Sequence, residues 1–120
     1  MTTAWYAPSI PRPGAIAVQY FFDVRVNHES LSFDELWEMW EKEAEAAIPA
    51  VKAGRLQLWK VSGQRRVIGI IEADSHDELD RIFMAGLPMA HVLEFVEIVP
   101  VRSYEAFAED VKARWKAVQA

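Results

Sequence analysis

The residue best placed for chemistry is Glu43, in a segment patterned as an amphipathic helix over residues 32–54. At about 100° per residue, the apolar side chains of this segment share one broad arc, and most of its charged side chains lie opposite. Glu43 falls inside the apolar arc, between Trp40 and Ala47. Desolvation there would raise its pKa toward the range in which a carboxylate takes and returns a proton near neutral pH. Glu43 is therefore the candidate acid–base; the competing interpretation is an ion pair with Arg or Lys across the sheet.

The composition predicts one globular domain over residues 1–120 without metal or thiol chemistry. The chain is 52% hydrophobic and 26% charged, which is enough to bury a core. It has no cysteine, and its three histidines lack short metal-ligand spacing. We therefore expect an active site that uses no cofactor and no metal.

Charge and patterning also limit the partners and the location. The net charge of −5 and the pI near 5.2 argue against nucleic-acid binding, which needs basic surface. No Gly-rich phosphate loop occurs. The chain shows no signal-peptide pattern and no apolar run near the roughly 20 residues of a membrane helix. We expect a cytoplasmic protein without nucleic-acid or membrane partners.

The elements that must position Glu43 follow from alternation and turn signals. The expected strands cover residues 16–26, 56–61, 66–72 and 92–101, and the expected helices cover residues 32–54, 75–86 and 103–120. This β-α-β-β-α-β order predicts an α+β, ferredoxin-like fold: an antiparallel four-stranded sheet with two helices on one face, plus a C-terminal helix. Proline-rich residues 1–15 are expected to form an N-terminal arm.

Local signals set the predicted boundaries. Two capping boxes, Ser32 with Glu35 and Ser75 with Glu78, should begin the first two helices. Gly54 should end the first helix. Gly69, inside the third strand, predicts a bulge or a close approach by another group.

The first strand has an oily row and a mixed row, and either could lie on the uncovered face of the sheet. The mixed row consists of Ala17, Gln19, Phe21, Asp23 and Arg25. A sheet that is open on one side and partly apolar usually meets a second copy of itself. We therefore expect at least a homodimer, as in a dimeric α+β barrel. The last helix also carries an apolar stripe, which predicts that it packs on something.

A set of motifs after Glu43 resembles the muconolactone isomerase family over roughly residues 20–103. The motifs are G-x(3)-LW-[KR]-x-x-G (Gly54, Leu58, Trp59, Lys60, Gly63), an LP pair (Leu87, Pro88) and acidic alternation in the last strand (Glu94, Glu97). The resemblance implies a ferredoxin-like protomer, dimers that often assemble into rings, and cofactor-free proton transfer on an unsaturated lactone. Counting back from Gly54, it also implies an acid–base carboxylate at Glu43, the residue that the helical period singles out.

The resemblance also implies a protonatable side chain in the third strand near Ile68, where this chain has only VIGII. Candidates for a second group are His91, Tyr20, Asp23 and Arg25. His91 follows the LP turn and would shuttle protons, or it is an exposed loop residue.

The binding residues carry two interpretations each. Asp23 and Arg25 would bind a substrate carboxylate or enolate, or form a salt-bridged rim of a dimer interface. Trp40 and Trp59 would wall an apolar pocket, or pack in the core. Arg65 and Arg66 are expected to be solvated hairpin residues.

The sequence thus favours a small isomerase or cyclase that abstracts and returns a proton on a lactone or other carbonyl substrate. Such an enzyme would belong to aromatic catabolism or to natural-product biosynthesis. The alternatives are a cofactor-independent monooxygenase of the dimeric α+β barrel type and a non-catalytic binding module. In the last case Glu43 should be ion-paired, with no cavity beside it.

Overall fold

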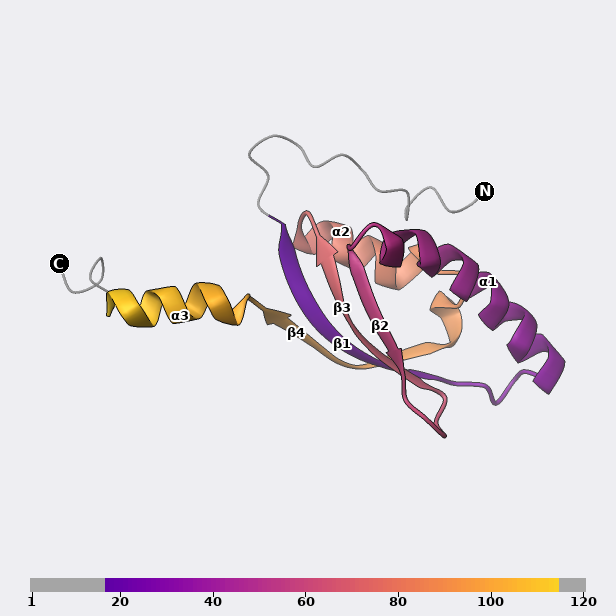
Figure 1. Cartoon of the computed structure of the whole chain (residues 1–120). Coiled ribbons are helices and arrows are strands. Elements are labelled where there is room, and N and C mark those ends of the chain that lie inside the picture. Colours follow the sequence, from indigo (N-terminus) through magenta and orange to yellow (C-terminus); the bar gives the residue numbers. More distant parts are fainter. Residues whose placement is uncertain (1–16, 115–120) are drawn as a thin grey trace.

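The computed structural model describes residues 17–114. Four strands form one antiparallel sheet in the order β2-β3-β1-β4: β1 Val18–Val26, β2 Leu56–Lys60, β3 Arg66–Ala73 and β4 Leu93–Val101. The helices are α1 Phe33–Lys52, α2 His76–Arg81 and α3 Tyr104–Ala113. α1 and α2 cover one face of the sheet and leave the other open (Figure 1). The predicted ferredoxin-like α+β fold is confirmed. The predicted arm, residues 1–15, lies outside the described residues.

α1 begins and ends at the predicted signals. The Ser32 hydroxyl accepts a hydrogen bond from the backbone N–H of Glu35 (3.1 Å), and the Glu35 carboxylate accepts one from the backbone N–H of Ser32 (2.8 Å). Gly54 follows the helix with φ +79°, in the left-handed region that favours glycine. The first capping box and the glycine stop are both confirmed, so local chemistry sets the limits of the helix that carries Glu43.

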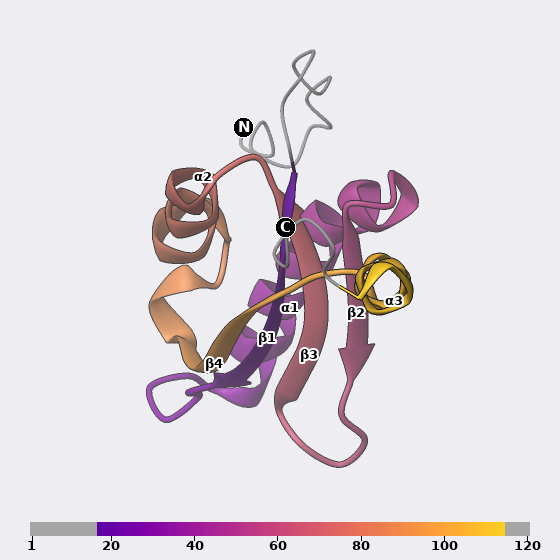
Figure 2. The ribbon, with the colours of Figure 1, turned by 90° about the vertical axis from the view of Figure 1, so that its left-hand side faces the viewer.

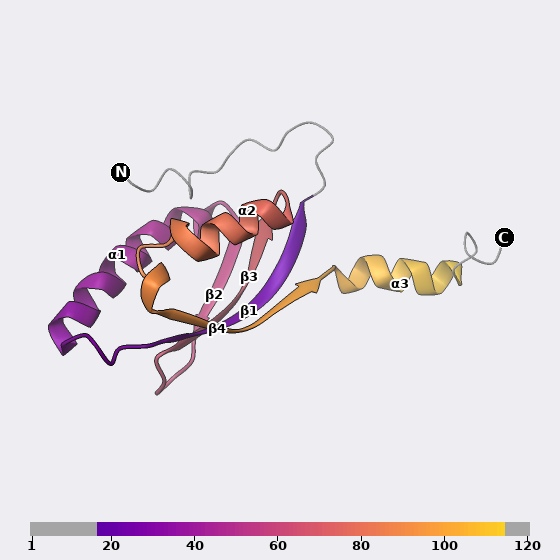
Figure 3. The same ribbon diagram turned by 180° about the vertical axis from the view of Figure 1, so that it is seen from behind.

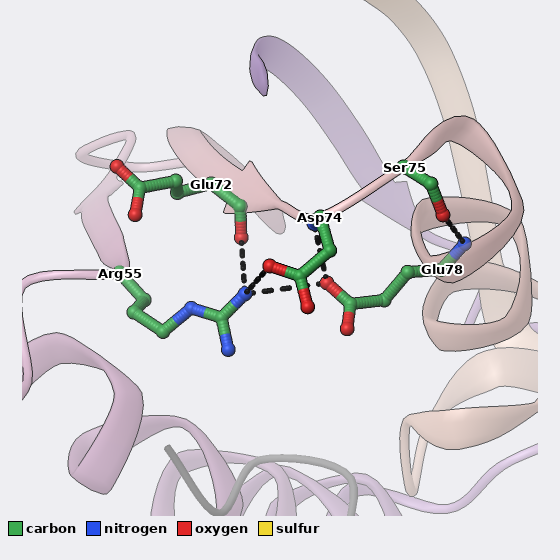
Figure 4. A network of polar contacts seen from close by, with 5 residues as sticks. All are labelled: Arg55, Glu72, Asp74, Ser75 and Glu78. Carbon is green, nitrogen blue, oxygen red and sulfur yellow. Dashed lines mark hydrogen bonds and ion pairs between the residues drawn. The ribbon is translucent and has the colours of Figure 1, made fainter. Parts of the chain in front are cut away.

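The second capping box forms only in half (Figure 4). The Ser75 hydroxyl accepts from the backbone N–H of Glu78 (3.1 Å). The Glu78 carboxylate, however, accepts from the backbone N–H of Asp74 (2.8 Å) and from Arg55 (3.2 Å). Arg55 also donates to the carbonyl of Glu72 (3.3 Å) and pairs with Asp74 (3.7 Å). The cation of Arg55 draws the carboxylate, and the network ties the start of β2 to the start of α2.

The segment after α2 departs from a regular helix. A π-helical turn, η2 (Ile82–Gly86), continues from α2 and buries Ile82 and Phe83. The chain is extended at Leu87 and then forms a short 3₁₀ turn, η3 (Ala90–Val92). In place of the single helix predicted over residues 75–86, the structure has the six-residue α-helix α2 followed by the π-helical turn η2.

The core consists of two apolar clusters on the helix side of the sheet. The larger joins the sheet to α2, η2 and three alanines of α1, Ala46, Ala47 and Ala50. The smaller holds the N-terminal half of α1 through Val26, Leu36, Met89 and Val92. α1 is thus anchored to the body at both ends by different sets of side chains.

Gly69 is needed because two neighbouring strands approach it closely. A Cβ atom at this position would lie 2.4 Å from the carbonyl oxygen of Gln57 and 2.9 Å from the ring of Phe22. Both are nearer than real Cβ contacts. The predicted close approach is confirmed.

α3 projects from the body beyond the end of β4 in Figures 1 and 3, and Figure 2 shows it end-on. None of its residues is buried. An ion pair of 2.7 Å joins Arg102, which precedes α3, to Asp110 in the second half of the helix. The apolar stripe of α3, which was predicted to pack on another surface, is therefore not buried in the described part of the chain.

Candidate active site

A cavity of about 440 Å³ lies between α1 and the sheet. Its wall is almost wholly apolar and rich in aromatic rings, which come from Phe22, Trp37, Trp40, Phe83 and Phe95. Within residues 17–114, the charged side chains that line it are Glu43 and Lys60. An apolar cavity with few polar groups is the usual form of a small-molecule site.

The cavity exists because α1 presents short side chains to the sheet at its middle. Ala44 and Ala47 line it, and they leave space that larger aliphatic side chains would fill. On either side the two core clusters hold α1 in place. The cavity is therefore left between the two clusters by the way in which they pack α1 against the sheet.

Glu43 points into this cavity and is half-buried. Its Oε1 accepts a hydrogen bond of 3.0 Å from the backbone N–H of Met89. Burial raises the pKa of the Glu43 carboxyl, and the Met89 N–H opposes part of that rise. No cation within residues 17–114 forms an ion pair with Glu43. The competing interpretation, an ion pair across the sheet, is therefore not what the described chain contains.

The turn that contains the LP pair presents a backbone N–H to Glu43. The carbonyl of Leu87 accepts a hydrogen bond from the backbone N–H of Ala90 (3.0 Å), which closes a turn. Pro88 and Met89 are its central residues, and Met89 has φ −98° and ψ 13°, as in a type I turn. The N–H of the third turn residue is not used within the turn. It is free to donate to Glu43.

The pocket-facing residues of β2 differ from the prediction. Leu56, Leu58 and Lys60 line the cavity, so the intervening Trp59 lies on the open face, where 54% of it is exposed. Trp59 was predicted to line the pocket or to pack in the core, and Lys60 was not among the predicted site residues. The alternation of β2 nevertheless indicates Lys60, because Leu56 and Leu58 form the apolar row of the strand and Lys60 continues that row.

Asp23 and Arg25 also lie on the open face, away from the cavity, because Phe22 and Val24 occupy the cavity phase of β1. Arg66 binds Asp23 through two hydrogen bonds, Nε to Oδ1 at 2.9 Å and Nη2 to Oδ2 at 2.6 Å. These bonds lower the pKa of Asp23. Arg66 is thus a half-buried partner, and the prediction of a solvated hairpin residue is wrong.

Tyr20 and His91 are not among the cavity residues either. Tyr20 faces the helix side, but its hydroxyl is hydrogen-bonded to Nδ1 of His76 at the start of α2. His91 lies in η3 with its side chain exposed. Of the predicted site residues, the structure brings together Glu43 and Trp40.

The third strand contributes only apolar side chains to the cavity, Val67 and Ile71, whereas Ile68 lies on the open face. Within residues 17–114, no three His, Asp or Glu side chains gather as metal ligands would. None of the helices in that range has the length and apolar character required to cross a bilayer.

Comparison with known protein families matches residues 18–106 to the muconolactone delta-isomerase family. No curated protein was found to match the chain. The matched region starts with the first residue of β1 and ends in the first turn of α3, so it contains the sheet, α1 and every residue that lines the cavity. Because the match covers most of the sequence, the chain belongs to the muconolactone delta-isomerase family.

Proposed function

We propose that the protein is a cofactor-free isomerase or cyclase that moves a proton on an unsaturated lactone or related carbonyl compound, with Glu43 as the acid–base. The observation that carries this proposal is the position of Glu43. It is a carboxylate without an ion-pair partner in the described chain, aimed into an apolar cavity, with a raised pKa. Family membership supports the same class of reaction.

In the proposed reaction, the Glu43 carboxylate takes a proton from a carbon activated by the substrate carbonyl. The C–H electron pair moves into the conjugated system and places negative charge on the carbonyl oxygen. The protonated Glu43 then returns the proton to a different carbon, which gives the isomer. Alternatively, the enolate carbon attacks a second carbonyl carbon of the same molecule and closes a ring; the C=O π bond of that carbonyl opens, and its oxygen takes the proton from Glu43. A raised pKa suits both steps, since one group must act as base and then as acid.

Lys60 is the group we propose to offset the developing negative charge or to bind an anionic substituent at the cavity edge. It lines the cavity while its side chain is exposed, and it donates to the carbonyl of its neighbour Val61 (2.9 Å).

The test is exchange of carbon-bound hydrogen with solvent. Unsaturated γ-lactones and cyclic enones are incubated with the protein in D₂O, and deuterium uptake and double-bond position are followed by NMR. We expect uptake with the wild-type protein and with the control Glu45→Gln, an exposed glutamate of the same helix. Glu43→Gln should abolish it. Equal exchange by Glu43→Gln would remove Glu43 from the mechanism.

A second candidate is a cofactor-independent monooxygenase, which the aromatic wall of the cavity favours because it would hold an electron-rich phenol. Stoichiometric oxygen uptake during turnover would identify it. The hypothesis of a non-catalytic binding module expects an ion-paired Glu43 and no cavity, whereas in the described chain Glu43 faces a cavity and accepts a hydrogen bond from the Met89 N–H.

We further propose a homodimer, or a larger assembly, formed through the open face of the sheet. This face carries exposed Trp59, Val99 and Val101 together with half-buried Phe21 and Ile70. A cytoplasmic role in aromatic catabolism or natural-product biosynthesis fits the proposed chemistry.

A further inference from the structure

A row of aromatic rings leads from the cavity to solvent along the first turns of α1. We name Phe33, Trp37 and Trp40 the aromatic rim. The centroids of Phe33 and Trp37 lie 5.4 Å apart with the rings nearly perpendicular (83°), and those of Trp37 and Trp40 lie 5.8 Å apart. Trp37 and Trp40 line the cavity. Phe33 is 62% and Trp37 49% exposed, so the rim extends the cavity wall outward.

The rim is not needed to hold α1 on the body. Leu36, one residue before Trp37, is 2% exposed and anchors this part of the helix in the smaller core cluster, with partial help from Trp40. Phe33 does not belong to that cluster, and neither does Trp37. Two large apolar side chains therefore stay half in water beside a cavity mouth, a position that favours contact with a ligand.

We propose that Trp37, braced edge-on by Phe33, is an outer subsite that stacks on a planar unsaturated ring of the substrate. The reacting carbonyl would lie at Glu43 and a further ring would pass Trp40 to reach Trp37. The substrate class is then a fused-ring or aryl-extended carbonyl compound, longer than a single lactone ring. A cavity of about 440 Å³ suits a ligand of that size. This inference rests on the proposed function, because it uses Glu43 as the reacting end.

The occupant is a small molecule because the rim is continuous with the cavity wall. Trp37 contributes to both, so a ligand ring on Trp37 stays in contact with the part bound inside. A second copy of the chain has another apolar surface to meet, the open face of the sheet, which lies opposite α1 (Figure 2).

The experiment compares two unreactive probes, 2-naphthol with two fused rings and 2-hydroxyanthraquinone with three, by isothermal titration calorimetry. Trp37→Ala should weaken binding of the three-ring probe about tenfold and of the two-ring probe by less than about twofold. Trp37→Phe should restore most of the affinity. The control is Met84→Ala, which removes a large apolar side chain that is 70% exposed and does not line the cavity, and it should leave both affinities unchanged.

Three outcomes would overturn the inference. Trp37→Ala could lower the affinity for both probes by the same factor. It could leave both affinities unchanged, and a change in the mass of the protein in solution would then assign the rim to contact with a second copy. Finally, the wild-type protein could bind neither probe. Deuterium exchange on a single-ring lactone, measured separately, would still decide the role of Glu43, so failure of the outer subsite can be told apart from failure of the proposed function. If Trp37→Ala does not fold, Trp37→Leu, which removes the aromatic ring but keeps an apolar helix-forming side chain, should show the same selective loss for the three-ring probe.

Discussion

Two carboxylates on opposite sides of the sheet behave in opposite ways. Asp23, on the open face, is the more deeply buried, at 6% exposure, yet its pKa is lowered. Glu43, on the helix side, is only half-buried, and its pKa is raised. The difference lies in the partner: Arg66 compensates Asp23, whereas Glu43 has a backbone N–H. A carboxylate becomes a candidate acid–base when it is desolvated without a cation, and depth of burial alone does not produce that state.

The surroundings of each group explain the difference in partners. β3 places the guanidinium of Arg66 close enough to Asp23 for a bidentate pair. The cavity that Glu43 faces is lined by uncharged side chains such as Val24, Phe95 and Met89. Lys60 lines the same cavity but forms no ion pair with Glu43. Asp23 on the open face is thus held in a structural ion pair, whereas Glu43 on the helix side remains available to a ligand.

The largest expected effect is on turnover. Glu43→Gln keeps the shape of the side chain and removes its basicity, so we expect proton exchange to fall by about 10²–10⁴-fold. Asp23→Asn, which changes the other carboxylate in the same manner, should lower turnover no more than its loss of stability explains. Deuterium-exchange rates measured by NMR on folded protein check both. A large, specific loss in Asp23→Asn would reverse the roles assigned to the two groups.

The next effect is on stability, and it should be asymmetric. Arg66→Ala leaves a nearly buried carboxylate unpaired and should cost about 2–3 kcal/mol in the free energy of unfolding at pH 7. Asp23→Ala should cost less, because the half-buried Arg66 side chain can turn to water. Urea denaturation of both variants measures the difference. Equal costs would show that Asp23 is better solvated than its exposure indicates.

The same pair predicts a pH dependence with a definite sign. The pKa of Asp23 is lower in the folded state than its ordinary value of 3.8, so its contribution is present above pH 3.8. That contribution is lost as pH falls through the folded pKa. The stability gap between wild type and Arg66→Ala should therefore close in strong acid, as urea midpoints measured between pH 2 and pH 7 would report.

A smaller effect is expected at Gly69, which supports the cavity wall. Gly69→Ala would force a Cβ against the carbonyl of Gln57 and the ring of Phe22. We expect a loss of about 1–3 kcal/mol and weaker probe binding, since Phe22 lines the cavity. The control is Gly63→Ala in the β2–β3 turn, where a Cβ would meet no atom within 4 Å but φ is +79°. It should destabilise through backbone strain alone, without changing probe affinity.

The smallest effect concerns the stability of the Glu43 variant. Because the folded pKa of Glu43 is above its ordinary value of 4.5, wild-type stability should fall as pH rises from 4.5 through the folded pKa. Glu43→Gln lacks this loss. Its free energy of unfolding should equal that of wild type near pH 4 and exceed it at pH 8 by at most about 1 kcal/mol. A variant less stable at pH 8 than at pH 4, relative to wild type, would contradict the raised pKa.

The sequence by itself determined the elements and the position of Glu43 on its helix. The Ser32 box, the Gly54 stop and the strand alternation act between residues close in the chain, so they can be read without the fold. In β2 the oily phase of Leu56 and Leu58 already indicates that Lys60, and not Trp59, faces the helices. In β1 only the tertiary structure decided which phase faces the helices, and that choice removed Asp23 and Arg25 from the cavity. It also chose the partners, Arg66 for Asp23 and the Met89 N–H for Glu43, because such pairs depend on strand register and on packing between distant segments.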